Sequence, residues 1–194
     1  MTVRTHLIAL QLALAAASPW ALANSPYAGE ETREIKALSA DEVEGLLAGR
    51  GMGYAKAAEL NGYPGPAHVL ELAAQLSLTE AQLAQTRALH ARMQREAQAA
   101  GRELVAAERE LDALYRTQQA TPERLSGTLA QVAARQAQVR EAHLKAHIEQ
   151  RALLSAQQVA QYQALRGYTG SAPSHPKGGH QGGHHGGHRH HGSH

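Results

Sequence analysis

A helical pattern runs from residue 78 to residue 153 and is interrupted once, at Thr121-Pro122. Apolar and small residues recur in it at alternating spacings of three and four, which is the period of an amphipathic helix. Threonine suits a helix cap and proline the first helical position, so a second long helix should run from Pro122 to about Leu153. Because only about three residues join the two long helices, they must lie antiparallel.

The apolar seam of each long helix is narrow and consists mainly of alanine and leucine. In the first helix, which should extend to about Gln118, the seam positions are Leu83, Thr86, His90, Met93, Ala97, Ala100, Leu104, Ala107, Leu111 and Leu114. In the second helix they are Leu125, Leu129, Val132, Gln136, Val139, His143 and Ala146. Gly101 weakens the first helix by about 1 kcal/mol relative to alanine, so a bend is expected there. Such a thin pair buries little apolar area alone, which favours a homodimer.

The same short motif, Leu-Thr/Ser-x-x-Gln, stands at both ends of this pattern. It reads Leu78-Thr79-Glu80-Ala81-Gln82 at one end and Leu154-Ser155-Ala156-Gln157-Gln158 at the other. The hydroxyl residue is placed to cap a helix, the glutamine completes the capping box, and the leucine can pack on the residue five positions later as a hydrophobic staple. The second copy therefore predicts a last short helix that ends by Gly167.

Short helices are also expected before the first long helix. Ser39 begins a capping box for a helix that ends near Gly49. A second short helix should cover residues 54–60, and a third should begin at a proline and cover residues 66–76. Residues 27–36 should be extended or irregular. The predicted fold class is all-α, a long antiparallel helical hairpin with short flanking helices.

The first residues have the pattern of an export signal. An apolar run at residues 7–17 is followed by Pro19 and by the small-x-small sequence Ala21-Leu22-Ala23. The run is shorter than the about 20 residues that span a bilayer, although an uncleaved anchor is the alternative. We therefore expect a periplasmic protein whose mature chain begins at Asn24. The predicted divisions are a signal peptide at 1–23, a leader with short helices at 24–65, a helical hairpin domain at 66–168 and a tail at 169–194.

The composition argues against several classes of function. The chain has no cysteine, which excludes thiolate metal sites and cysteine catalysis. Its formal charge of +2 falls by one when the signal peptide is removed, which is too near neutral for nucleic-acid binding. After signal cleavage no segment is apolar enough for membrane insertion. Ser126 and Ser155 occupy helix starts, and the glycines of residues 49–53 lack the preceding strand of a phosphate loop, so we do not expect an enzyme.

Histidine is concentrated in the tail. The tail histidines are His175, His180, His184, His185, His188, His190, His191 and His194. Glycine, serine and proline between them cannot build a core, so we predict that residues 169–194 are disordered. Neutral imidazole binds Zn, Ni, Co and Cu ions, and the tail should therefore bind divalent transition metals without a fixed geometry. The alternatives are an engineered tag, which the irregular spacing disfavours, and a solvated spacer with incidental metal affinity.

Four histidines remain in the helical part, and we expect them to converge. His143 and His147 are four residues apart and share one face of their helix. Antiparallel pairing of the long helices sets His147 within one turn of His90. A second turn near residue 77 brings His68 to the same level. The pattern predicts a metal site of His90, His143 and His147 with His68 beside it; the alternative is that these histidines only pack or face solvent.

The paired Leu-Thr/Ser-x-x-Gln motifs around a long hairpin resemble those of the LTxxQ, or Spy/CpxP-like, family of periplasmic proteins. The resemblance covers about residues 66–168. The leader, including Ala58-Glu59-Leu60-Asn61, is similar to that of the heavy-metal-resistance subgroup, which holds periplasmic metal sensors and zinc-resistance-associated proteins. The resemblance implies an antiparallel helical dimer. It also implies partners that are unfolded clients or an inner-membrane sensor or anti-sigma protein.

The resemblance further implies metal ligands at the level of the four histidines, although this sequence departs from the sensors' pattern. Leu72 follows His68 where a second histidine is expected, His90 stands about where a carboxylate is used, and residues 149–151 offer no methionine. We therefore expect an altered site or a remnant. The expected function is sensing or sequestration of divalent transition metals in the periplasm. The alternative is a holdase-type chaperone that carries the tail as an accessory metal sponge.

Overall fold

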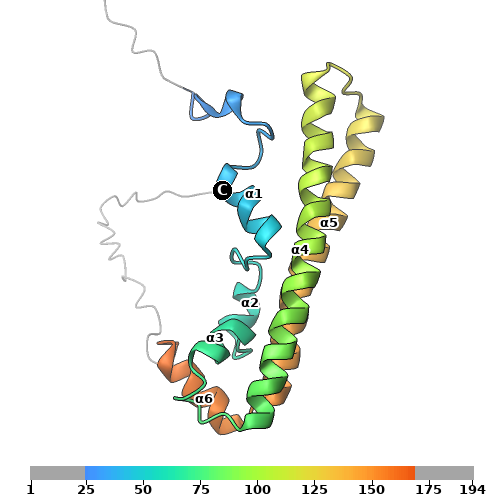
Figure 1. Ribbon diagram of the computed structural model, residues 1–194. Coiled ribbons are helices and arrows are strands. Elements are labelled where there is room, and N and C mark those ends of the chain that lie inside the picture. The colour runs from blue at the N-terminus through green and yellow to red at the C-terminus, as the bar shows by residue number, and fades with distance from the viewer. Residues whose placement is uncertain (1–24, 169–194) are drawn as a thin grey trace, which may run out of the picture.

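The computed structural model describes residues 25–168, and all of its regular elements are helical. The signal peptide predicted at 1–23 and the tail predicted at 169–194 lie outside these residues. The elements are η1, a 3-10 helix (Glu30–Thr32), α1 (Ala40–Ala48), α2 (Lys56–Glu59), α3 (Pro66–Glu71), α4 (Glu80–Arg116), α5 (Pro122–Leu153) and α6 (Ala156–Leu165). The long helices α4 and α5 run side by side, with the short leader helices along one side and α6 at the foot (Figure 1).

The two long helices begin and end close to the predicted residues because local signals fix their ends. The Thr79 side chain accepts a hydrogen bond from the Gln82 amide, and the Gln82 side chain accepts one from the Thr79 amide. At the start of α5, Thr121 accepts from the Arg124 amide and Pro122 occupies the first turn. The all-helical class and the long packed helix pair are therefore confirmed.

Two of the short helices are shorter than predicted. The helix expected over residues 54–60 is reduced to α2, and the helix expected over residues 66–76 ends at Glu71. After α3 the chain continues through turns to Ser77, whose φ of 48° is left-handed. These turns place Leu76, which is 1% exposed, in a core cluster at the foot of the molecule. Tertiary burial of this leucine accompanies the early end of α3.

Separate apolar clusters attach the leader and α6 to the long pair. At the foot, Val69 and Leu76 pack with Leu154, Val159 and Tyr162. Higher up, a second cluster joins the leader to the long helices through Ile35, Leu46, Leu104, Val105 and Val139. A third cluster of Leu89, Met93 and Ala146 lies between the long helices. The leader is thus attached to α4 and α5 through Ile35 and Leu46, and to Leu154 and α6 through Val69 and Leu76.

Gly101 marks the place where α1 crosses α4. A Cβ atom built on Gly101 would lie 2.1 Å from the carbonyl oxygen of Leu46. Glycine is the residue that permits such an approach of two backbones. The pattern of spacings could not show this, because it carries no information about what packs on the helix.

The predicted seams are correct only in part. On α4, Leu89 and Gly101 are buried, whereas the predicted seam residues His90 and Ala100 are half-buried. On α5 the upper half of the seam is not a core, and Leu129 is 45% exposed. Among the described elements, α1 and α3 pack mainly on α4, and none covers the upper part of α5 (Figure 1). Within residues 25–168, no helix combines the length and the apolar character needed to cross a membrane.

The two Leu-Thr/Ser-x-x-Gln motifs contact each other at the foot. The side-chain amide of Gln82 donates to Gln158 Oε1 at 2.9 Å, and that of Gln158 donates to Gln82 Oε1 at 3.0 Å. The same two amides also donate to the carbonyl oxygens of Leu153 at 2.9 Å and Leu76 at 3.2 Å. Each glutamine therefore completes its own capping box and also joins the start of α4 to the start of α6.

Candidate metal-binding cleft

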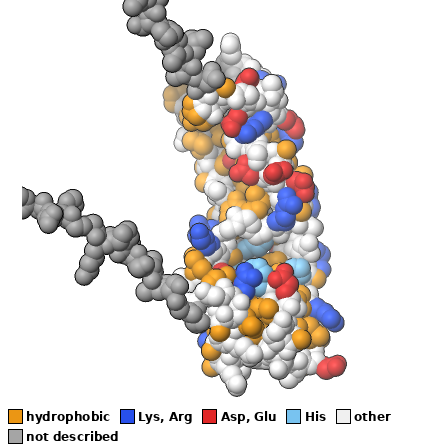
Figure 2. All heavy atoms as spheres, turned by 90° about the vertical axis from the view of Figure 1, so that its left-hand side faces the viewer, with side chains coloured by type: hydrophobic (Ala, Val, Ile, Leu, Met, Phe, Trp, Pro, Cys, Tyr) orange, Lys and Arg blue, Asp and Glu red, His pale blue; other side chains and the backbone are white. Residues whose placement is uncertain are grey.

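The four helical histidines line one cleft between the leader and the long helices. This histidine cleft, of about 790 Å³, is bordered by residues 48–71, by α4 and α5, and by Tyr168. His68 comes from α3, His90 from α4, and His143 and His147 from α5. Figure 2 shows histidine side chains grouped on one face, in the lower half of the molecule. The structure thus brings together side chains that are far apart in the sequence.

His143 is the most buried of the four, with 3% of its surface exposed. Its ring lies parallel to the ring of Tyr54, with centroids 6.4 Å apart. Burial lowers the pKa of His143 below its ordinary value, and the charge of neighbouring His147 lowers it further, whereas a hydrogen bond with the Arg50 backbone acts in the opposite direction. The ring is therefore neutral near pH 7. Its Nε2 atom is buried and has no hydrogen-bond partner among the described residues.

His147 is held in one orientation by the backbone of the leader. Its Nδ1 lies 2.7 Å from the carbonyl oxygen of Tyr63. A carbonyl oxygen only accepts, so Nδ1 carries the hydrogen of this contact. Gly65 lies against this ring, since a Cβ built there would be 2.9 Å from His147 Cε1. The missing side chain at Gly65 makes room for the imidazole.

Glu59 is a functional candidate that the sequence reasoning missed. It is 9% exposed, and its carboxylate lies 3.4 Å from His68 Nδ1 and 3.7 Å from His147 Nδ1. Its position inside a short Ala-rich helix gives no signal of this role. Only the folded chain shows that Glu59 of α2 lies at the end of the cleft where His68 and His147 lie.

The carboxylate of Glu59 also connects α2 to the end of α6. The hydroxyls of Tyr162 and Tyr168 donate to its Oε1, the latter at 3.2 Å, and the Gly65 amide donates to Oε2 at 3.2 Å. Arg166 forms an ion pair with it at 3.6 Å. Burial and the neighbouring carboxylate raise the pKa of Tyr162 well above its usual value, so its hydroxyl stays protonated and donates.

Within residues 25–168 the histidines line one cleft but do not form a preassembled cluster of ligands. No group of three or more His, Asp or Glu side chains within residues 25–168 is close enough together to hold a metal ion. Met93, a conceivable soft ligand for copper, is 8% exposed and packs with Leu89 and Ala146, in agreement with a packing role. The eight tail histidines lie outside the described residues.

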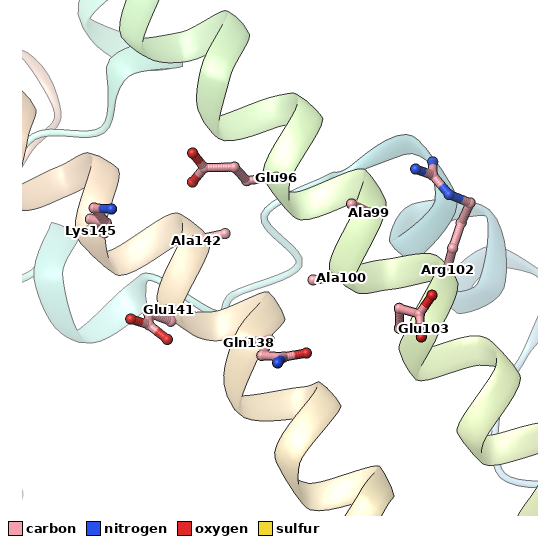
Figure 3. Close-up of a pocket in the computed structure, with 9 residues that line it drawn as sticks. All are labelled: Glu96, Ala99, Ala100, Arg102, Glu103, Gln138, Glu141, Ala142 and Lys145. Carbon is pink, nitrogen blue, oxygen red and sulfur yellow. The ribbon is translucent and has the colours of Figure 1, made fainter.

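A second hollow, between the two long helices, has a different character. In this groove of about 440 Å³, Ala99 and Ala100 of α4 and Ala142 of α5 lie between the helices (Figure 3). The charged and polar residues around them are Glu96, Arg102, Glu103, Gln138, Glu141 and Lys145. The groove has no histidine, and its charges are of both signs.

Comparisons with protein-family models, with curated proteins and with solved structures found no match to this chain.

Proposed function

We propose that this protein binds divalent transition metal ions in the histidine cleft and acts as a periplasmic metal-stress protein that senses or sequesters them. The observation that carries the proposal is the buried, unpartnered Nε2 of His143 in a cleft lined by three further histidines. Leaving a buried polar atom without a partner costs about 1–3 kcal/mol. A bound cation offsets that cost and explains why the atom is kept there.

The chemistry of the donors favours particular ions. Neutral imidazole nitrogens suit Zn, Ni, Co and Cu, whereas Mg and Ca prefer oxygen ligands. His143 and His147 offer ring nitrogens from α5, and His90 and His68 add nitrogens from α4 and α3. When bound, the ion supplies a cross-link between these elements, and we propose no catalytic step.

The Glu59 carboxylate supplies the outer support that metal-binding histidines usually have. A ligand histidine commonly gives its second ring nitrogen to a carboxylate or a backbone carbonyl, which fixes the ring. His147 Nδ1 lies 2.7 Å from the Tyr63 carbonyl oxygen and 3.7 Å from the Glu59 carboxylate. His68 Nδ1 meets the same carboxylate. The two Nδ1 atoms therefore face the carboxylate, while His68 Nε2 lies 3.5 Å from Nη2 of Arg166.

Calorimetric titration of Zn, Ni and Cu ions into the mature chain and into a chain ended after Tyr168 tests the proposal. We expect the shortened chain to bind one ion, and His143→Ala to abolish that binding. Gln131→Ala, an exposed change on the same helix, is the matched control and should leave it unchanged. If all binding is lost with the tail, the helical histidines are packing residues and the cleft proposal is wrong.

A holdase-type chaperone is the second candidate function. It is favoured by the exposed apolar residues near the free end of the long pair, where Tyr115 is 57% exposed and Leu129 is 45% exposed. Exposed apolar surface of this kind can hold unfolded segments. Suppression of aggregation of an unfolded client, measured with and without zinc, separates the two functions. A client effect that is independent of zinc and of His143 supports the chaperone.

We also propose a homodimer and an inner-membrane sensor or anti-sigma partner, as the resemblance to the LTxxQ family implies. The thin alanine-rich packing between the long helices supports self-association. Light scattering of the mature chain tests the dimer. A monomer at all concentrations contradicts it.

A further inference from the structure

Both methionines of the described residues line the histidine cleft. The chain has three methionines and no cysteine, and Met1 lies outside the described residues. The other two are Met52, in the leader loop between α1 and α2, and Met93 of α4. Met93 is 8% exposed and packs with Leu89 and Ala146, whereas Met52 is 42% exposed. Of these two residues, only Met52 combines a place on the cleft with a side chain that solvent reaches.

The backbone at Met52 has a conformation that methionine rarely adopts. Its φ is 42°, in the left-handed region, and a Cβ built on either neighbour, Gly51 or Gly53, would meet no atom within 4 Å. Glycine adopts this φ at little cost, whereas a residue with a long side chain is strained there. Strained residues of this kind cluster at binding sites. A binding role for its side chain therefore accounts for a methionine at this place in a glycine-rich loop.

The sulfur of Met52 rests against α1. A Cβ built on Gly45, a buried residue of α1, would lie 2.5 Å from Met52 Sδ. The missing side chain at Gly45 makes room for the thioether, as the missing side chain at Gly65 makes room for the His147 ring. The loop thus presents the sulfur from a defined seat at the border of the cleft.

Met52 also lies in the loop that holds His143. The ring of His143 forms a hydrogen bond with the Arg50 backbone and lies parallel to the ring of Tyr54. Met52 stands between these two residues in the chain, and because consecutive Cα atoms are about 3.8 Å apart, its Cα lies within about 7.6 Å of theirs. The loop therefore keeps the sulfur in the neighbourhood of the imidazole whose Nε2 is buried without a partner among the described residues.

These two donors suit monovalent copper, Cu(I), better than a divalent ion. Zinc sites usually take three or four protein ligands, and within residues 25–168 no three His, Asp or Glu side chains form a ready cluster. Cu(I) is stable at lower coordination numbers. Soft thioether sulfur selects Cu(I), and imidazole nitrogen also binds copper. One imidazole and one thioether are therefore enough for the core of a Cu(I) site.

We propose that Cu(I) binds in the histidine cleft between His143 Nε2 and Met52 Sδ, so that Met52 sets a preference of the cleft for copper. This inference rests on the proposed function, because it uses the same cleft and names the ion. The methionine side chain is flexible, so the sulfur can turn from Gly45 to the ion while the backbone stays in place. The copper arrives and stays in its monovalent state, and no electron is transferred.

Copper K-edge X-ray absorption of the mature chain, loaded with equimolar Cu(I) under nitrogen, tests the sulfur ligand directly. Apart from Met1, the only sulfur atoms of the chain belong to Met52 and Met93, so the histidine-rich tail cannot produce a copper–sulfur signal. We expect that signal in the unchanged protein and in the matched control Met93→Leu, and its loss in Met52→Leu. Absence of sulfur around copper in the unchanged protein, or its persistence in Met52→Leu, overturns the proposal.

Competition with a coloured Cu(I) chelator gives a second test. Loss of a ligand should weaken binding at least as much as loss of a residue that only supports a ligand, so Met52→Leu should weaken the tightest Cu(I) site by at least about tenfold. Calorimetry should show the same zinc affinity in Met52→Leu as in the unchanged protein, which also shows that the variant is folded. Equal Cu(I) affinities of the two proteins contradict the role of Met52.

The two proposals fail in different ways. If Met52→Leu leaves Cu(I) binding unchanged while His143→Ala still abolishes the zinc site, the copper proposal is wrong and the cleft site stands. If His143→Ala changes neither zinc nor Cu(I) binding, both proposals are wrong.

Discussion

Replacing Gly101 with alanine places a methyl group where α1 crosses α4. The new carbon would lie 2.1 Å from the Leu46 carbonyl oxygen and 2.7 Å from its carbonyl carbon, whereas ordinary contacts begin at 3.4 Å. These are backbone atoms, so no side-chain rotation relieves the overlap. The segment carrying Leu46 must retreat by about 1.3 Å, which loosens the packing of Leu46 against Leu104 and Val105.

The expected cost of Gly101→Ala follows from two opposing effects. Overpacking of a close contact costs about 1–3 kcal/mol, and partial exposure of Leu46, now 2% exposed, adds to it. Alanine also favours the helix over glycine by about 1 kcal/mol. Because the clash involves backbone atoms, we expect the loss to exceed the gain and the free energy of unfolding to fall by about 1–3 kcal/mol.

Gly127 provides a matched control within the same helix pair. It lies inside α5, is exposed, and a Cβ built there meets no atom within 4 Å. Gly127→Ala should therefore gain the helix preference alone and stabilise by about 1 kcal/mol. Urea unfolding followed by far-ultraviolet circular dichroism measures both variants. If Gly101→Ala stabilises the protein as Gly127→Ala does, the close packing of α1 on α4 is refuted.

Three further predictions concern the foot and the cleft. Gln82→Glu keeps the capping box but loses the side-chain amide that donates to Gln158 and Leu153. We expect the free energy of unfolding, measured in urea, to fall by about 1–3 kcal/mol. The exposed control Gln85→Glu should leave it unchanged. Glu59→Gln removes the negative charge that accepts hydrogen bonds from two tyrosine hydroxyls, so we expect a lower melting temperature. An unchanged melting temperature contradicts the role of this carboxylate. His143 has a folded pKa below its ordinary value of 6.5, so without metal its contribution to stability is complete above about pH 6.5 and is lost as the pH falls below that value. The drop in unfolding free energy between about pH 7 and pH 5 should be smaller in His143→Leu, and equal drops would count against a buried neutral ring.

The long helices could be predicted from the sequence because their determinants are local. The capping residues Ser39, Thr79 and Ser155, each with its partner three positions later, form the expected capping boxes. Pro122 starts α5 as a first-turn proline should. Such signals act within one turn of helix, so a reading of neighbouring residues is enough to find them.

The face that each helix buries could not be predicted because it depends on distant segments. Leu129 has the spacing of a core residue, but it is 45% exposed because no element within residues 25–168 covers that part of α5. The early end of α3 accompanies the burial of Leu76 among residues of α6 and its neighbours. The spacing of apolar residues within a helix predicts where its apolar stripe runs. It does not predict which other segment packs on that stripe.

The sequence was enough to predict the height of the candidate site along the helix pair, but not the contacts of its side chains. Counting residues from the turn between the long helices places His147 near His90, and the structure places all four histidines on one cleft. The count gives the height of each residue along the helix pair. It gives neither the burial of His143 against Tyr54 nor the attachment of His68 and His147 to Glu59.

The contact between Gln82 and Gln158 is expected to form late in folding. The pair of amides is separated by 76 positions in the chain, whereas the turn between α4 and α5 brings neighbouring residues together first. Contacts between residues that are close in sequence form faster than contacts between distant ones. We therefore expect the two long helices to pair first near their turn and last at the foot. As the chain is synthesised from its N-terminus, the foot stays open until Gln158 has emerged. A chain that lacks the last short helix should therefore have paired long helices but no contact between the two motifs at the foot.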